Sequence, residues 1–230
     1  NFIKVAAVQA SPVFFDVHSC LDKAEQLVKD AKSQGCSLIA FGEAWFPGYP
    51  FHIWLGPPAW WLQYTEIYQA NSLALNSIEF ERLCSLAKDS EIMISAGISE
   101  RANSSLYLSQ VLIDRSGELL NLRRKLKPTH VERSVFGEGY GIDLAVTDTD
   151  IGRVGQLCCW EHLQPLSKYA LYSQNEQIHI SAWPSFILYK EQAHALGAEV
   201  NMAASQIYAV EGQCFVIAAT STIDQAALDF

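Results

Sequence analysis

Three residues that are far apart in the chain have the types needed for covalent catalysis: Glu43, Lys125 and Cys159. A cysteine thiolate is a strong nucleophile. A carboxylate can take the proton from the thiol as a general base. An ammonium group can stabilise negative charge that develops on nitrogen or oxygen, and it also favours the thiolate. Together the three side chains could form and break down a covalent intermediate.

Cys159 follows an apolar β-type run and precedes a predicted helix. The partial positive charge of a helix N-terminus would stabilise a thiolate at that position. Most single cysteines, however, are small buried apolar residues. Cys158 fits that structural role, and neighbouring side chains of a strand face opposite sides. Position alone leaves open which of the two cysteines faces a site.

Glu43 comes directly after a buried apolar run, and Lys125 lies at the end of a predicted hairpin. Glu43 could be a general base with a raised pKa beside a cation, or a strand-end residue that caps a helix or pairs with a surface lysine. Lys125 could serve the site or be a solvated charge on an edge strand. Lys127 would point to the same side, so periodicity does not separate the two lysines.

The first forty residues predict a strand–helix–strand unit, which connects in a right-handed crossover. Residues 4–9 are apolar and β-rich. Asp16 or Ser19 can cap the following helix, and Gly35 can end it. Residues 37–41 form a continuous apolar run, which is typical of a strand buried on both faces. Glu43 is therefore expected at the end of a central strand.

The remaining chain alternates short elements. Residues 45–61 carry four tryptophans and four prolines and predict a long aromatic loop rather than a regular element. Later segments predict helices at 62–88 with a break near Asn71, after 162, and over most of 191–211. They predict strands at 91–99, 106–113, 119–124, 144–147, 153–158, 177–182 and 213–219, with 126–143 irregular. The mixture of hairpins and strand–helix–strand units predicts a layered α/β sandwich with mixed sheets.

Composition narrows the function classes. The 230 residues show no linker, so we expect a single domain over 1–230, and the net charge of −9 disfavours nucleic-acid binding. No apolar run approaches the roughly 20 residues that span a membrane, and the N-terminus does not resemble a signal peptide. The six cysteines show no disulfide spacing, which favours reduced thiols in a cytoplasmic protein. No cysteine or histidine spacing suggests a metal site, and the six histidines are scattered.

Three segments, taken in order, resemble the nitrilase superfamily and specifically its nitrilase branch. They are FGEAWFPGYP at 41–50, RRKLKPTHVER at 123–133 and LCCWEH at 157–162. The similarity continues at 165–169, 176–179 and 208–213, so it covers nearly the whole chain. It implies a four-layer αββα sandwich with mixed β-sheets. The order of Glu43, Lys125 and Cys159 matches the catalytic triad of the family.

The resemblance also assigns roles that spacing leaves open. The family nucleophile directly precedes Trp-Glu, which selects Cys159, and the family lysine follows Arg-Arg, which selects Lys125. Glu43 matches the general base. Glu132 matches a supporting glutamate near the triad, although a salt bridge with Arg133 or a nearby lysine is its structural alternative. The oxyanion and substrate-binding set is Trp160, through its backbone N–H, with Tyr49, His130 and Trp183.

The implied activity is hydrolysis of an organic nitrile to a carboxylic acid and ammonia, without a metal or organic cofactor. Cyanide hydrolysis or amide hydrolysis by the same triad is the alternative within the class, and a catalytically silent interaction protein is the alternative outside it. Residues 45–61 would supply local packing, a subunit interface or apolar walls for the nitrile. The resemblance further implies a homodimer building block, spirals or filaments, and a C-terminal continuation after Phe230.

Overall fold

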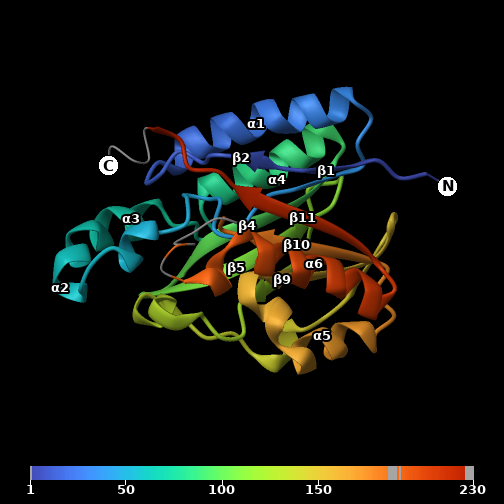
Figure 1. Ribbon diagram of the computed structural model, residues 1–230. Helices are drawn as coiled ribbons and strands as arrows, with labels where there is room; N and C mark the ends of the chain where they lie inside the picture. Colours follow the sequence, from blue (N-terminus) through green and yellow to red (C-terminus); the bar gives the residue numbers. More distant parts are fainter. Residues whose placement is uncertain (1, 186–190, 192, 226–230) are drawn as a thin grey trace.

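Two mixed β-sheets lie face to face in the computed structural model, which describes residues 2–185, 191 and 193–225 (Figure 1). The first sheet has the order β1 (Val5–Ala7), β3 (Leu38–Ala40), β4 (Met93–Ala102), β5 (Ser105–Ile113) and β6 (Leu119–Arg124), and β7 (Phe136–Gly137) also pairs with β5. The second has the order β2 (Gln9–Ala10), β11 (Phe215–Ser221), β10 (Ile178–Trp183), β9 (Gly152–Cys158) and β8 (Thr147–Thr149). Each sheet contains parallel and antiparallel pairs.

Two long helices cover the outer face of the first sheet: α1 (Val17–Ser33) and α4 (Ile78–Ser90). Asp16, rather than Ser19, caps α1, because its Oδ1 accepts the Ser19 backbone N–H at 2.9 Å. Gly35 follows the helix at a φ of +78°, a conformation that glycine adopts without strain. Strands β1 and β3 on either side of α1 pair in parallel, as the strand–helix–strand prediction requires.

The apolar residues divide into layers that match this arrangement. One cluster joins the inner faces of α1 and α4 to alternate residues of β3, β4 and β5. A second lies between the sheets, where Leu38 and Leu112 meet Ile180 and Ile217. A third joins β9 to α5 (Pro165–Tyr172) and α6 (Ala198–Gly212) through Leu157, Leu171 and Tyr208. The predicted four-layer α/β sandwich with mixed sheets is therefore confirmed, with helices on both outer faces (Figure 1).

Several boundaries differ from the prediction. The first predicted strand is two short strands in different sheets, since β1 pairs with β3 while β2 pairs with β11. The aromatic segment is not wholly irregular: it contains η1 (Phe51–Trp54) and α2 (Pro58–Trp61), followed by η2 (Leu62–Tyr64) and α3 (Thr65–Asn71). Proline at the first position of α2 suits a helix start, which explains helix formation in a proline-rich segment. The break near Asn71 is confirmed.

The C-terminal half shows smaller shifts. The strand predicted at 144–147 lies at β8 instead, and the predicted irregular stretch 126–143 contains η3 (His130–Ser134), β7 and η4 (Gly141–Asp143). A turn, η5 (Cys159–Leu163), comes between β9 and α5. The helix predicted from 191 begins only at Ala198, after η6 (His194–Leu196). Residue 192 of that segment and residues 226–230 of the chain end lie outside the described residues.

Within residues 2–185, 191 and 193–225, no helix is both long and apolar enough to cross a membrane.

Candidate active site

The three predicted catalytic residues all follow strand ends. Glu43 lies three residues beyond β3 and Lys125 directly after β6, both on the first sheet. Cys159 directly follows β9 on the second sheet. The backbone N–H of Glu43 donates to the carbonyl of Trp183 at 3.1 Å, and Trp183 packs in one cluster with Cys159. The packing of the two sheets thus brings the three residues together.

Lys125 is buried between two carboxylates. Its Nζ donates to Glu43 Oε1 and to Glu132 Oε2, each at 2.8 Å. Burial alone would lower the pKa of Lys125, but the charges of Glu132 and Glu43 raise it well above its ordinary value. Lys127 instead pairs with Glu138 at the surface, with 59% of its side chain exposed. The structure therefore places Lys125, and not Lys127, in the site.

Glu43 has the environment of a general base. Burial raises the pKa of its carboxyl to about 7, against the lowering effect of the Lys125 ammonium. Oε1 accepts from Lys125, whereas Oε2 is buried and has no hydrogen-bond partner among the described residues. A carboxylate with one anchored and one unpartnered oxygen can accept a proton without losing its position.

Two glycines allow the chain to reach this position. A Cβ on Gly42 would lie 2.6 Å from the Trp183 carbonyl oxygen, and a Cβ on Gly97 would lie 2.1 Å from the Gly42 carbonyl oxygen. Side chains at either place would push β4 and β10 away from the segment that carries Glu43. Sequence reasoning missed both residues, since their requirement depends on contacts with distant strands.

Glu132 is anchored through both carboxylate oxygens. Oε1 accepts from the Tyr49 hydroxyl at 2.6 Å, and Oε2 accepts from Lys125 and from the Thr129 backbone N–H at 2.6 Å. Trp54 Nε1 in turn donates to the Tyr49 hydroxyl at 3.0 Å. Glu132 thus pairs with a lysine, as its structural alternative required, but that lysine is Lys125. Both oxygens being engaged, Glu132 is placed to hold Lys125 rather than to collect a proton.

Cys159 is the first residue of η5 and has a φ of +46°. This left-handed conformation is strained for a residue other than glycine. Burial raises the pKa of its thiol well above the ordinary value, and Glu43 raises it further, while Lys125 and the Trp160 backbone N–H act in the opposite direction. The Trp160 backbone N–H at the start of η5 thus favours the thiolate as expected, but burial has the larger effect and acts in the opposite direction. Burial outweighs the local charges, so the thiol needs a base.

A buried ion pair that sequence reasoning missed fixes the chain on both sides of Cys159. The two terminal nitrogens of Arg123 donate to the two oxygens of Glu161 at 2.7 and 2.8 Å. Glu161 also accepts the backbone N–H groups of Cys158 and Leu126, each at 2.8 Å. One carboxylate therefore joins the segment after Lys125 to the segment before Cys159. The only sequence signal was a charged residue two positions from each of Lys125 and Cys159.

The predicted binding residues occupy different positions around this core. His130, at a φ of +49°, stacks on Trp54 with ring centroids 5.6 Å apart. Trp160 is partly exposed and packs beside Cys159. Trp183 is fully buried, and its Nε1 donates to the Ser181 and Ser205 hydroxyls. Trp160 and Trp183 thus flank Cys159, whereas His130 lies on the Tyr49 and Glu132 side.

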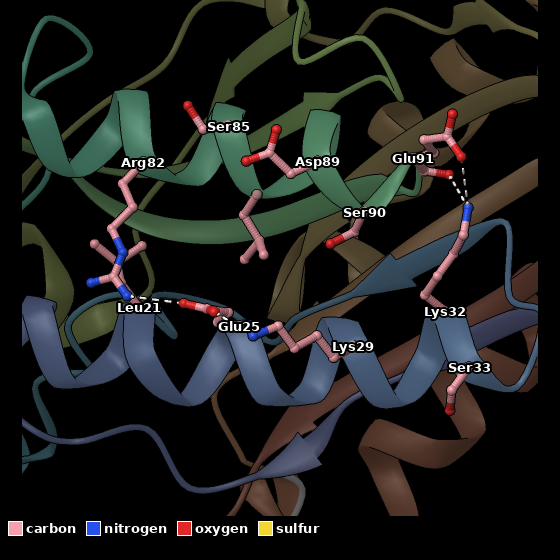
Figure 2. Close-up of a pocket in the computed structure, with 11 residues that line it drawn as sticks. Leu21, Glu25, Lys29, Lys32, Ser33, Arg82, Ser85, Asp89, Ser90 and Glu91 are labelled. Carbon is pink, nitrogen blue, oxygen red and sulfur yellow. Dashed lines mark hydrogen bonds and ion pairs between the residues drawn. The ribbon is translucent and has the colours of Figure 1, made fainter.

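Two cavities differ in their relation to the triad. One of about 480 Å³ is lined by His130, Trp160, Glu161 and the segment after Lys125, so it borders the site. Another of about 630 Å³ is a surface groove between α1 and α4, away from the triad (Figure 2). Most of its charged side chains pair with each other, as Arg82 does with Glu25 and Lys32 with Glu91. The second groove therefore has the character of a solvated helix–helix surface.

The cysteines and histidines form no metal centre in the described part of the chain. All six cysteines are free thiols. No group of three or more His, Cys, Asp or Glu side chains among the described residues is arranged to hold a metal ion.

Comparison with known proteins adds family evidence. A family model described as carbon-nitrogen hydrolase matches residues 4–229. The chain is 63% identical over 229 residues to "Nitrilase, arylacetone-specific" from Alcaligenes faecalis, covering 100% of this chain and 64% of that protein. It is 46% identical over 231 residues to an aliphatic nitrilase from Rhodococcus rhodochrous, covering 100% and 63%. It is 40% identical over 230 residues to an arylacetonitrilase from Aspergillus niger, covering 99% and 70%. The chain thus spans 64% and 63% of the length of the first two relatives.

Solved structures support the fold. An amidase from Nesterenkonia sp. AN1 superimposes with a TM-score of 0.75 at 17% identity, covering 98% of this chain and 81% of that one. The C. elegans NitFhit protein gives a TM-score of 0.73 at 20% identity, covering 96% and 51%. Likeness at such low identity extends to the arrangement of the strands and helices and no further.

Proposed function

This chain belongs to the carbon–nitrogen hydrolase family and, within it, to the nitrilase branch, and from that premise we propose that it hydrolyses an organic nitrile to the carboxylic acid and ammonia. The names of its relatives support nitriles as the substrate class. The chain spans 64% and 63% of the length of two of these relatives. The activity and the substrate class are therefore proposals for the whole protein.

One observation carries the proposal: a buried Lys125 holds Glu43 by a single oxygen beside the Cys159 thiol. Glu43 supplies a base whose pKa is about 7, which suits proton transfer near neutral pH. Lys125 supplies a permanent positive charge, since its carboxylate neighbours raise its pKa. A base, a cation and a thiol that needs deprotonation are the parts required for covalent attack.

In the first step, Glu43 Oε2 takes the proton from Cys159 Sγ, and the thiolate attacks the nitrile carbon. A carbon–sulfur bond forms, and one π bond of the nitrile breaks toward nitrogen. Lys125 and the Trp160 backbone N–H stabilise the negative nitrogen, which takes up the proton held by Glu43. The product of this step is a covalent thioimidate on Cys159.

Two water molecules complete the reaction. Glu43 deprotonates the first water as it adds to the thioimidate carbon, and the nitrogen leaves as ammonia after protonation, giving an acyl-thioester. A second water, activated in the same way, releases the carboxylic acid and regenerates the thiol. Glu132 keeps Lys125 in position throughout, because both its oxygens are already engaged as hydrogen-bond acceptors.

Replacement of each adjacent cysteine tests the nucleophile. Cys159→Ala should abolish ammonia release from a nitrile, whereas Cys158→Ala should retain it. Mass spectrometry of the native protein under turnover should show a thioimidate or acyl adduct on the peptide that contains Cys159. Ammonia release that survives Cys159→Ala would refute the assignment. An inactive but folded Cys158→Ala variant would point to the neighbouring thiol.

Substrate profiling tests the reaction class. We expect phenylacetonitrile, benzonitrile or an aliphatic dinitrile to be turned over faster than the matching amides and faster than cyanide. The cavity that borders Trp160 offers a partly apolar approach for the organic part of such a substrate. Amide turnover that exceeds nitrile turnover would replace nitrile hydrolysis by amide hydrolysis with the same residues.

We also infer that the protein forms homo-oligomers. The outer faces of α5 and α6 expose large apolar side chains, among them Leu166, Tyr169 and Val210. Exposed apolar groups on two adjacent helices suit contact with a second copy. Sedimentation of Leu166→Asp beside the native protein tests this, and an unchanged sedimentation coefficient would contradict it. Spirals or filaments and a cytoplasmic location stay predictions.

A further inference from the structure

A chain of buried polar side chains leads away from the Cys159 carbonyl and takes no part in the steps above. His162 Nδ1 lies 2.6 Å from the Cys159 carbonyl oxygen, and His162 Nε2 lies 2.9 Å from His179 Nε2. His179 Nδ1 lies 2.7 Å from Glu176 Oε1, and Tyr208 donates to Glu176 Oε2 at 2.6 Å. All these side chains are buried.

The hydrogen-bond directions in this chain follow from its first member. A carbonyl oxygen only accepts, so His162 carries its proton on Nδ1. Burial lowers the pKa of His162 well below its ordinary value, so the ring is neutral and its Nε2 is an acceptor. His179 therefore donates through Nε2. The proton between His179 and Glu176 completes the chain, whichever of the two groups holds it.

Ring stacking fixes the two imidazoles in place. His162 stacks on Trp183 with centroids 5.1 Å apart and planes 22° apart. His179 stacks on Tyr208 with centroids 3.7 Å apart and planes 23° apart. Neither ring can turn without breaking a stack and a buried hydrogen bond, so the donor at His162 Nδ1 has a fixed direction.

The Cys159 carbonyl, which accepts the hydrogen bond from His162 Nδ1, belongs to the same peptide unit as the Trp160 N–H. The bond between Cys159 and Trp160 is trans, because the one cis bond of the described chain is Phe46–Pro47. In a trans peptide the C=O and N–H point in opposite directions. A donor that holds the Cys159 carbonyl therefore also sets the direction of the Trp160 N–H. It further stabilises Cys159 at its strained φ of +46°.

We propose that His162, His179 and Glu176 are positioning residues that aim the Trp160 backbone N–H at the nitrogen of the substrate. The inference rests on the proposed function, in which that N–H stabilises the negative nitrogen. The three side chains form a hydrogen-bonded support for the peptide bond between Cys159 and Trp160. Without it the peptide could rotate, and the N–H would lose its direction while the thiol stayed in place.

Variants of His162 separate a donor from a space-filling group. His162→Asn can still donate to the Cys159 carbonyl, because the amide nitrogen of asparagine corresponds to Nδ1. His162→Leu fills similar space without a donor. We expect His162→Leu to lower kcat by about 10²-fold, the scale of one lost oxyanion donor, with little change in KM. His162→Asn should retain most of the activity, and the exposed His18→Leu serves as the control.

Alkylation of Cys159 by iodoacetamide distinguishes positioning of the N–H from general disruption. Displacement of iodide by the thiolate needs Glu43, an accessible sulfur and the thiolate that the Trp160 N–H favours, but it develops no negative charge on a substrate nitrogen. His162→Leu should therefore slow alkylation of Cys159, measured on the Cys159 peptide by mass spectrometry, by a much smaller factor than it lowers kcat. Parallel losses of alkylation and nitrile turnover, or equal activity of His162→Leu and His162→Asn, would overturn the proposal.

Glu176 tests the distal end of the chain. Glu176→Gln can donate to His179 Nδ1 and accept from Tyr208, so the hydrogen-bond directions persist and activity should be close to native. Glu176→Leu removes both contacts and should lower kcat as His162→Leu does, with thermal melting used to confirm folding. Absence of nitrile turnover in the native protein would refute the proposed function itself. Native turnover with a fully active His162→Leu variant would refute only the positioning chain.

Discussion

Glu43 and Lys125, 82 residues apart in the sequence, share a 2.8 Å hydrogen bond at a place where neither side chain is more than 1% exposed. A buried ion pair of this kind has to offset the loss of hydration of both charges. Here a second carboxylate, Glu132, shares the lysine. The charge of Lys125 is thus balanced by Glu132, which leaves Glu43 free to change its protonation state during turnover.

The pH dependence of activity should reflect Glu43. Its pKa of about 7 means that the carboxyl holds a proton below that pH and cannot accept one from Cys159. For an uncharged nitrile, kcat/KM should therefore rise by about tenfold per pH unit on the acidic side and level off above about pH 7. A profile without an inflection near that pH, or one that falls as pH rises through it, would contradict Glu43 as the base.

Glu132→Gln should move that inflection without removing it. The negative charge of Glu132 raises the pKa of Glu43, so its removal should shift the acidic limb to lower pH. At the same time kcat should fall, because Lys125 loses a charged partner. Tyr49→Phe keeps the charge of Glu132 and is the matched control, for which the limb should stay in place. Loss of the limb in Glu132→Gln would identify Glu132 as the base instead.

Arg123→Met should strongly destabilise the protein. It leaves the buried Glu161 carboxylate without its guanidinium partner, which costs about 3–5 kcal/mol of unfolding free energy. Arg82→Met breaks an exposed pair with Asp22 and should cost less than about 1 kcal/mol. Urea denaturation of both variants measures the difference. Equal small effects would show that the backbone N–H donors alone hold Glu161.

Two leucine truncations should separate stability from catalysis. Leu38→Ala and Leu83→Ala each remove a fully buried side chain and should each cost about 2–5 kcal/mol. Leu38 lies between the sheets, whereas Leu83 is on the buried face of α4, on the outer side of the first sheet. Only Leu38→Ala should also lower kcat, since Glu43 and Cys159 are on opposite sheets. Assays at a temperature where both variants remain folded test this, and equal kcat values would contradict it.

Local signals predicted the positions of most strands along the chain and the approximate ends of α1. Asp16 and Gly35 mark the ends of α1 through short-range chemistry that a sequence displays directly. The apolar run before Glu43 likewise predicted a buried strand. The resemblance to a family then distinguished Lys125 from Lys127, a choice that periodicity left open and that the burial of Lys125 matches.

Properties that arise from tertiary contacts could not be predicted in this way. The high pKa of the Cys159 thiol comes mainly from burial, which outweighs the local charges that the sequence suggested. The Arg123–Glu161 pair joins residues 38 positions apart, one on β6 of the first sheet and one on η5, which follows β9 of the second. His162 and His179 meet because β9 and β10 pair in parallel and η5 folds back over them. Scattered histidines in a sequence carry no sign of such a contact.

The placement of the triad on two sheets also divides it along the chain. Residues up to 143 carry Glu43, Lys125 and the whole first sheet, while Cys159 and its histidine support come later. Neither segment alone contains both a base and a nucleophile. The short β2 strand of the first segment adds to the sheet of the second, beside β11. If the chain were cut between η4 and β8, the base and the nucleophile would lie on different fragments. Nitrile turnover would then require the two fragments to associate, and it would measure that association.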